Sequence, residues 1–331
     1  MKGTTRRTAL AGLTGLAGLS ACAPMVQRAG RPPLGFVGPS IEKDVFVAAD
    51  GARLPLDAWA PEGEPWAALI ALHGMNDYAN AFAYSAPWWA SQGVATYAYD
   101  QRGFGRAPDR GVWGGTELMV EDLRTFAALA RARHPKAVLG VLGHSMGGAV
   151  AITAFASDNP PQADRLILAA PAVWGWSRQA LPNRLALWIS AHVVPSWRIT
   201  PPSWLTQRIQ ASDNIEVLRA MGRDRNMIFD TRVDAVYGLV QLMQHADENL
   251  AKVRMPLLYL YGAHDEIIPK SAALHAARGL KPVDRSAYYA DGWHLLTRDL
   301  QGPKVWADIE SYLRDPAAPL PSGAPPLPLM G

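Results

Sequence analysis

The sequence predicts an α/β fold in which a mostly parallel, twisted sheet is covered by helices on both faces. Continuous apolar runs of strand length alternate with stretches in which apolar residues recur every three to four positions. Parallel strands that are buried on both faces have this uniform apolar character, and helices form the crossovers between them. The chain has 331 residues, 49% of them hydrophobic, which is enough for one large domain with a full core.

Eight strands are expected along the chain. The first two have no helix between them, so they suit an antiparallel edge of the sheet. Helical stretches separate several of the later strands, as at 116–133, 146–156 and 303–313. The expected strands cover residues 44–47, 54–59, 67–72, 94–99, 137–142, 165–170, 255–261 and 285–289.

One segment interrupts this alternation. Residues 172–252 contain no clear strand, and most of the segment has a helical pattern. We interpret it as a helical cap inserted over the end of the sheet. Five of the twelve tryptophans lie in it, namely Trp174, Trp176, Trp188, Trp197 and Trp204. Trp174 and Trp188, together with Trp293, are candidates for lining an apolar slot for substrate, and the alternative is that these rings only pack the cap on the sheet.

The first 21 residues have the pattern of an export signal. They begin with Lys2, Arg6 and Arg7, continue with an apolar centre and end in small residues. The only cysteine, Cys22, follows directly, and Leu19-Ser20-Ala21-Cys22 resembles the lipobox of bacterial lipoproteins. The resemblance implies that Cys22 is lipidated and becomes the mature N-terminus. The paired arginines also resemble a twin-arginine export signal.

The rest of the chain divides into three parts. Residues 22–40 are expected to be a tether, 41–314 the folded domain, and 315–331 a Pro-rich tail that is extended or disordered. Without the first 21 residues the chain carries 29 basic and 29 acidic residues. Because no run of Lys or Arg occurs elsewhere, nucleic-acid binding is not expected.

Cys22 has a second interpretation. If this cysteine is incidental and not lipidated, the signal is cut nearby and the protein is free and soluble.

The stretch Gly143-His144-Ser145-Met146-Gly147 lies between an apolar strand and a helix. A sharp turn in that position is typical of the nucleophile elbow, in which small residues let the turn close and the serine hydroxyl is exposed. Taken alone, the motif could also be an ordinary tight turn. His144 is expected to pack against the turn or support it, because it points away from Ser145 in a strained elbow.

A base and an acid are expected at the ends of the last two strands. His294 closes Asp291-Gly292-Trp293-His294, directly after the last strand, and is the candidate base. Asp265 follows the preceding strand and is favoured as the acid that orients it, with Glu266 and then Asp291 as alternatives. The chain order Ser, Asp, His is one of the known orders for a catalytic triad.

Two backbone amides are candidates for holding an oxyanion. One belongs to Met146, directly after the serine. The other belongs to Met75, in the loop after strand 67–72, where His73-Gly74 ends the strand. No Cys/His cluster or phosphate-binding loop is visible, so we expect neither a metal nor an organic cofactor.

Together these pieces resemble the α/β-hydrolase family, and within it the group of monoacylglycerol lipases, lysophospholipase-like hydrolases and serine aminopeptidases. The similarity covers residues 41–314; the cap matches least, and Arg106 stands where the family often has a small residue. The segments that carry it are LHGMNDYANAF, YAYDQRGFG, GHSMGGAVA, YGAHDEIIP and DGWHLLTRD. The resemblance implies an α/β-hydrolase fold, a triad of Ser145, Asp265 and His294, and oxyanion amides at Met75 and Met146.

The expected function is therefore that of a serine hydrolase for carboxylic esters. The resemblance implies monoacylglycerol- or lysophospholipid-like lipid esters and an acyl-enzyme on Ser145. A peptidase or an acyltransferase could use the same triad, and a catalytically silent envelope lipoprotein could use the fold for binding. The N-terminal pattern predicts an exported protein anchored on a membrane of the bacterial cell envelope, and nothing in the sequence indicates an oligomeric state.

Overall fold

The computed structural model describes residues 23–200 and 209–328. The expected signal at 1–21, together with Cys22 and Trp204, lies outside the described residues. Within the described parts of the chain, no helix is long and apolar enough to cross a membrane.

A nine-stranded sheet forms the centre of the molecule, and its strand order is β1-β2-β3-β5-β4-β6-β7-β10-β11. The six strands from β5 to β11 are parallel, whereas β1, β2 and β3 add an antiparallel edge. The predicted fold class is confirmed, and each expected strand lies within two residues of its predicted bounds. The strands are β1 Ser40–Ile41, β2 Val45–Val47, β3 Arg53–Trp59, β4 Ala67–Leu72, β5 Val94–Tyr99, β6 Val138–His144, β7 Arg165–Ala169, β10 Leu257–Gly262 and β11 Arg285–Tyr289.

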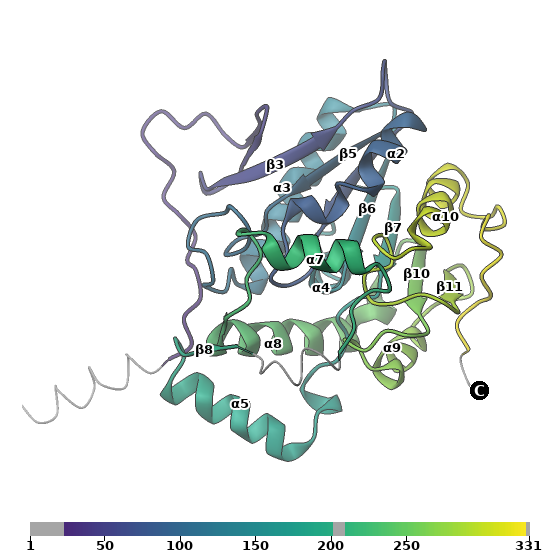
Figure 1. The fold of residues 1–331 in the computed structure, drawn as a ribbon. Coiled ribbons are helices and arrows are strands. Elements are labelled where there is room, and N and C mark those ends of the chain that lie inside the picture. The colour runs from purple at the N-terminus through teal and green to yellow at the C-terminus, as the bar shows by residue number, and fades with distance from the viewer. Residues whose placement is uncertain (1–22, 201–208, 329–331) are drawn as a thin grey trace, which may run out of the picture.

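Helices cover both faces of this sheet (Figure 1). Every residue of β4, β5 and β10 is buried, as expected for strands between two helical layers. One layer contains η1 (Ala79–Phe82), α2 (Ser85–Ser91) and α10 (Gly302–Arg314). The other contains α3 (Thr116–Arg133), α4 (Met146–Phe155) and α9 (Lys270–Ala277). The two hydrophobic cores lie between these layers and the sheet.

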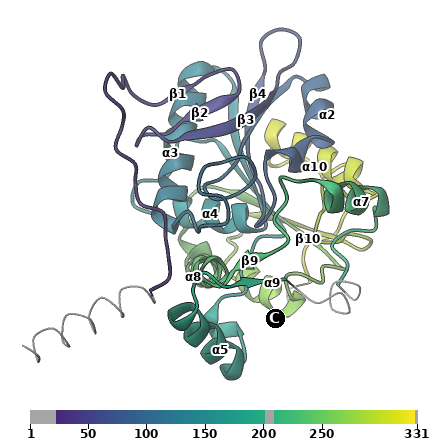
Figure 2. The same ribbon diagram turned by 60° about the vertical axis from the view of Figure 1, so that its left-hand side comes forward.

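The segment between β7 and β10 lies over the carboxyl ends of the parallel strands. Its helix α8 packs on α4, and α5 packs on α8, so α5 is the outermost layer (Figures 1 and 2). The sequence analysis predicts no strand here, but β8 and β9 form a short antiparallel pair. The elements are η2 Trp176–Arg178, α5 Leu181–Val193, β8 Arg198–Ile199, α7 Ile215–Arg223, β9 Thr231–Arg232, α8 Val233–Asn249 and η3 Leu250–Lys252.

Both end segments contact the folded body. The expected tether pairs with it at Val26, which forms a bridge with Trp113. Over the described residues 315–328 the Pro-rich tail contains turns and packs along β11. The Tyr288 amide donates to the Pro325 carbonyl at 2.8 Å, and Leu327 is buried. The tail packs here because β11 is an edge strand, whose outer backbone N–H and C=O groups have no neighbouring strand to bond to. Proline is tolerated at such an edge.

Candidate active site

Ser145 lies in a strained turn between β6 and α4. Its φ of 51° is in the left-handed region, which a serine adopts only where the surrounding structure enforces it. The start of α4 comes so close to β4 that a Cβ on Gly147 would lie 2.3 Å from the Leu72 carbonyl oxygen. This close approach requires glycine, and it holds the serine at the carboxyl end of the central strands.

Asp265 and His294 form a buried pair beside this turn. The Nδ1 of His294 donates to Oδ2 of Asp265 at 2.9 Å, and both side chains are almost fully shielded from water. The other oxygen of Asp265 accepts the amides of Ile267 (2.8 Å) and Ile268 (2.9 Å). The carboxylate is therefore fixed by three donors, and the imidazole keeps its Nε2 as an acceptor for a proton.

The other candidate groups have different partners. Glu266 accepts the Gln210 amide at 2.6 Å, and Asp291 is exposed. His144 turns away from Ser145, and its Nε2 donates to the His294 carbonyl at 3.0 Å. Burial, followed by the neighbouring His294, lowers the pKa of His144 to about 3, so its ring is neutral at physiological pH. His144 holds the loop of His294 and does not act on Ser145.

The Met75 amide lies in the loop after β4, and the Met146 amide lies in the serine turn itself. Met146 is the first residue of α4, where a helix leaves its N–H groups without an internal acceptor. Neither amide has a hydrogen-bond acceptor within residues 23–200 and 209–328. His73 fixes the loop that carries Met75. Its Nδ1 donates to the Gly74 carbonyl and its Nε2 accepts the Gln101 amide, each at 2.8 Å.

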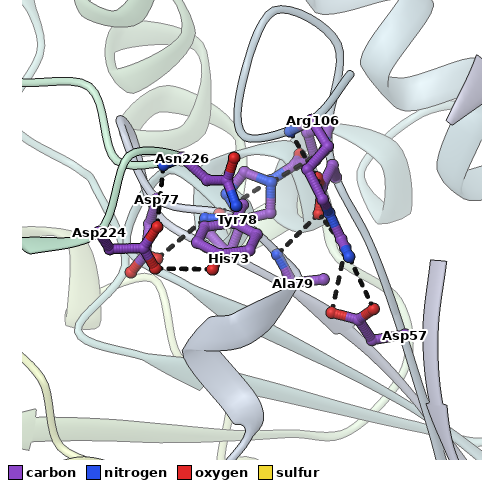
Figure 3. Close-up of polar contacts among 10 residues, drawn as sticks. Asp57, His73, Asp77, Tyr78, Ala79, Arg106, Asp224 and Asn226 are labelled. Carbon is purple, nitrogen blue, oxygen red and sulfur yellow. Dashed lines mark hydrogen bonds and ion pairs between the residues drawn. The ribbon is translucent and has the colours of Figure 1, made fainter. Parts of the chain in front are cut away.

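The loop after β4 is also tied to the segment above the sheet. The Asn76 side chain donates to Oγ1 of Thr231 at 2.7 Å, and its carbonyl accepts the Ile228 amide at 3.0 Å. Tyr78 donates through its hydroxyl to Asp224 at 2.6 Å (Figure 3). Burial and this carboxylate raise the pKa of Tyr78 to about 12, so the hydroxyl keeps its proton. These contacts fix the position of the loop that carries the Met75 amide.

Arg106 supports the same loop from the opposite side (Figure 3). Its guanidinium binds Asp100 and Asp57 and lies over the Tyr78 ring, 5.3 Å from the centroid. Asp100 also accepts the Ala79 amide at 3.0 Å. Arg106, the residue that departs from the family pattern, thus stabilises the loop that carries Met75. The positive charge of Arg106 is paired with the carboxylates of Asp57 and Asp100.

A cavity of about 450 Å³ opens above Ser145 and His294. Its walls are mostly apolar and come from the segment between β7 and β10 and from the loop after β10. Trp174 lines it, as the sequence analysis predicts. Trp188 and Trp293 do not: Trp188 is 53% exposed and stacks on His192, and Trp293 stacks on His264. Apolar residues along the wall include Leu187, Leu239, Val240, Met243 and Ile268.

Two further acids lie near the site, and the sequence assigns neither of them a role. Asp77 lines the cavity and forms a buried ion pair with Arg298. Asp299 accepts the Trp293 amide and the Ser212 hydroxyl, each at 2.7 Å, and so holds the loop after β11 that carries His294. Burial raises the pKa of Asp299 to about 6. Both acids lie in segments that carry the family resemblance, LHGMNDYANAF and DGWHLLTRD, but nothing in those segments predicts their partners.

The chain is similar in sequence to known hydrolases. Residues 63–301 match the family model described as serine aminopeptidase, S33. This match spans well over half of the chain. The chain belongs to this family, within the α/β-hydrolases. A monoacylglycerol lipase of Mycolicibacterium smegmatis is 26% identical over 68% of this chain and 79% of its own length. The human monoglyceride lipase is 23% identical over 85% of this chain and 93% of its own length.

Solved structures show the same fold. A soluble variant of monoglyceride lipase from Saccharomyces cerevisiae, in complex with a substrate analog, has a TM-score of 0.68 at 17% identity, covering 86% of this chain and 98% of that one. The Paleococcus ferrophilus monoacylglycerol lipase has a TM-score of 0.64 at 16% identity, covering 78% and 98%. Family membership and the lipase relatives together identify the chain as a carboxylic ester hydrolase.

The link between Asn76 and Thr231 generates a test of how the Met75 amide is held. Asn76→Gly keeps the left-handed backbone (φ 64°) but removes the side-chain donor, and Thr231→Val removes the acceptor. Each change should lower kcat on a short soluble ester roughly three- to ten-fold, the value of one hydrogen bond, with little change in KM. Steady-state kinetics measure this.

A double-mutant cycle supplies the control. The combined variant should be no slower than the worse single variant, because both substitutions break the same hydrogen bond. Fully additive losses in kcat, or losses confined to KM, would show that this bond does not position the loop.

Proposed function

We propose that the protein hydrolyses lipid esters of the monoacylglycerol or lysophospholipid type through an acyl-enzyme on Ser145. The observation that carries this proposal is the position of Ser145 at the floor of an apolar cavity, beside the buried Asp265–His294 pair. An apolar wall suits an acyl chain, and a cavity of this size buries most of a small amphiphile. The lipase relatives support the same substrate class.

The geometry leads to a covalent acyl transfer. His294 takes the proton of Ser145 through Nε2 as the serine oxygen attacks the ester carbonyl. Asp265 keeps the proton of the imidazole on Nδ1 and stabilises the imidazolium that forms. The amides of Met75 and Met146 donate to the oxyanion, and His294 returns its proton to the leaving alcohol. Water, activated by the same histidine, then releases the fatty acid.

The charges of the cavity favour an ester over a peptide. An aminopeptidase must bind a substrate ammonium, which needs a free carboxylate or a set of carbonyl oxygens. Among the described residues that line the cavity, Asp77 is the single acid, and its charge is already paired with Arg298. A monoacylglycerol-type ester has no ammonium group and therefore needs no free carboxylate in the cavity. Transfer of the acyl group to another alcohol instead of water would use the same residues.

We also propose that the protein is exported and anchored to an envelope membrane through acyl chains on Cys22. The basis is the lipobox-like stretch that follows the signal-like first 21 residues. Two or three acyl chains give stable anchoring, since each buried CH₂ contributes about 0.8 kcal/mol. An enzyme held on a membrane in this way would meet single-chain lipids directly.

Labelling with a fluorophosphonate probe tests the nucleophile. The wild-type chain should be labelled and should cleave monoacylglycerols faster than aminoacyl-anilides. Ser145→Ala should lose both labelling and at least 1,000-fold of the esterase activity, the size of loss typical for a removed nucleophile. Ser177→Ala, which changes a serine outside the proposed site, is the matched control and should behave as wild type. Equal labelling of Ser145→Ala would refute the proposal, and a preference for the anilides would refute the substrate class.

Metabolic labelling tests the anchor separately. Cells given a clickable fatty-acid analogue should incorporate it into the wild-type chain and not into Cys22→Ser, because no other cysteine is present. Ser20→Ala, which keeps a small residue in the lipobox-like stretch, should still be labelled. Label that persists in Cys22→Ser would rule out this cysteine as the acylation site.

A further inference from the structure

Residues 210–214, here called the strap, contact the loops that carry Asp265 and His294. The strap belongs to the segment between β7 and β10 and leads directly into α7 (Figure 1). At its first residue, the Gln210 amide donates to the carboxylate of Glu266 at 2.6 Å. At its last residue, the Asn214 side chain donates to the Arg298 carbonyl at 3.1 Å. The strap is therefore tied at one end to the loop of the proposed acid and at the other end to the loop of the proposed base.

Both chain neighbours of the proposed base have their backbone amides held by the strap or through it. The Leu295 amide donates to the Ala211 carbonyl at 3.0 Å. On the other side, the Trp293 amide donates to Oδ2 of Asp299 at 2.7 Å, and Oδ1 of the same carboxylate accepts the Ser212 hydroxyl at 2.7 Å. The backbone before and after the imidazole is thus fixed to two consecutive residues of the strap.

The Ser212 hydroxyl is buried and has two partners. It donates to Asp299 and accepts the Asn214 amide at 3.1 Å. A buried carboxylate needs such a donor, because burial penalises its charged form. Burial raises the pKa of Asp299 to about 6, and the hydrogen bond from Ser212 acts in the opposite direction. Ser212 thus helps to keep Asp299 ionised, the form in which this carboxylate accepts the Trp293 amide most strongly.

The Ser212 side chain does not reach the substrate cavity. Of the strap, Ala211 lines the cavity above Ser145, whereas Ser212 and its partner Asp299 do not. Ser212 can therefore influence the reaction through the backbone beside the base, and not through contact with a substrate.

We propose that Ser212 is a positioning residue, which acts on His294 through Asp299 and so aligns the imidazole with the proposed nucleophile. This inference rests on the proposed acyl transfer but concerns how the base is held. Proton transfer requires the base within hydrogen-bond reach of the serine hydroxyl, so a small displacement of the imidazole slows the chemical step. Loosening the strap should therefore lower kcat and leave substrate binding intact.

Steady-state kinetics on a short soluble ester test this role. Ser212→Ala should lower kcat roughly ten-fold with little change in KM, because a hydrogen bond to a charged group is lost away from the substrate. The matched control is Ser85→Ala, which removes another fully buried serine hydroxyl, one that donates to the Phe82 carbonyl at 3.3 Å. It should keep the wild-type kcat. Thermal melts show whether each variant is folded at the assay temperature.

The pH dependence separates positioning from a general loss of stability. Without the Ser212 hydroxyl, the pKa of Asp299 rises further, so this carboxyl is neutral over a wider pH range. The loss of kcat in Ser212→Ala should therefore be several-fold larger at about pH 6.5 than at about pH 9. Asp213, which raises the pKa of Asp299, and His294, which lowers it, are present in both proteins.

Asp299→Asn, which keeps the shape of the side chain, is the second variant. It should also lower kcat roughly ten-fold. Adding Ser212→Ala to it should cost less than about two-fold more, with no pH dependence of its own, because both changes break the same connection. Additive losses, or an equal loss in Ser212→Ala at every pH, would overturn the positioning role.

The proposed reaction and the positioning role fail differently. A wild-type chain that neither hydrolyses the ester nor reacts with fluorophosphonate would refute the acyl transfer, and the role of Ser212 with it. An active wild-type chain labelled at Ser145, together with a Ser212→Ala variant of equal kcat, would refute the role of Ser212 alone.

Discussion

The close approach of α4 to the end of β4 is the constraint on which the site depends. With only hydrogen at the Cα of Gly147, the helix can begin directly above the Leu72 carbonyl, and Ser145 is forced into the left-handed region. The same turn leaves the Met146 amide at the free N-terminus of α4. Asp265 and His294 follow β10 and β11, and the carboxyl ends of these parallel strands meet the turn at one edge. A side chain at position 147 would therefore displace the proposed nucleophile, Ser145, together with the proposed oxyanion donor, the Met146 amide.

A second set of hydrogen bonds holds the loops around this turn in place. His144, His73 and Asp299 each hold a loop of the site by a buried hydrogen bond to backbone. Asn76 and Tyr78 then connect the loop after β4 to the segment that covers the cavity. Leu187 of that segment lines the cavity, while the other side of α5 is exposed.

The sequence predicts what depends on local pattern. Uniform apolar runs predict the strands, and chemistry-bearing residues at strand ends predict that Ser145, Asp265 and His294 meet. The contacts that the sequence does not predict join distant positions: Asn76 and Thr231 are 155 residues apart, and Asp77 and Arg298 are 221 apart. The tryptophans show the same limit, since spacing along a helix cannot tell whether Trp188 faces the cavity or the solvent. The tail packs on β11 because of an unpaired edge, which no pattern within the tail itself reveals.

The proposed reaction is an oxyanion-stabilised acyl transfer inside the apolar cavity, with Ser145 as its nucleophile. The most direct measurement is a crystal structure of the protein after reaction with a long-chain alkyl fluorophosphonate. We expect a bond from Ser145 Oγ to phosphorus and a phosphonyl oxygen about 2.7–3.1 Å from the Met75 and Met146 amides. The alkyl chain should lie along Trp174 and Leu187. A phosphonyl oxygen turned toward solvent, or a chain outside the cavity, would contradict it.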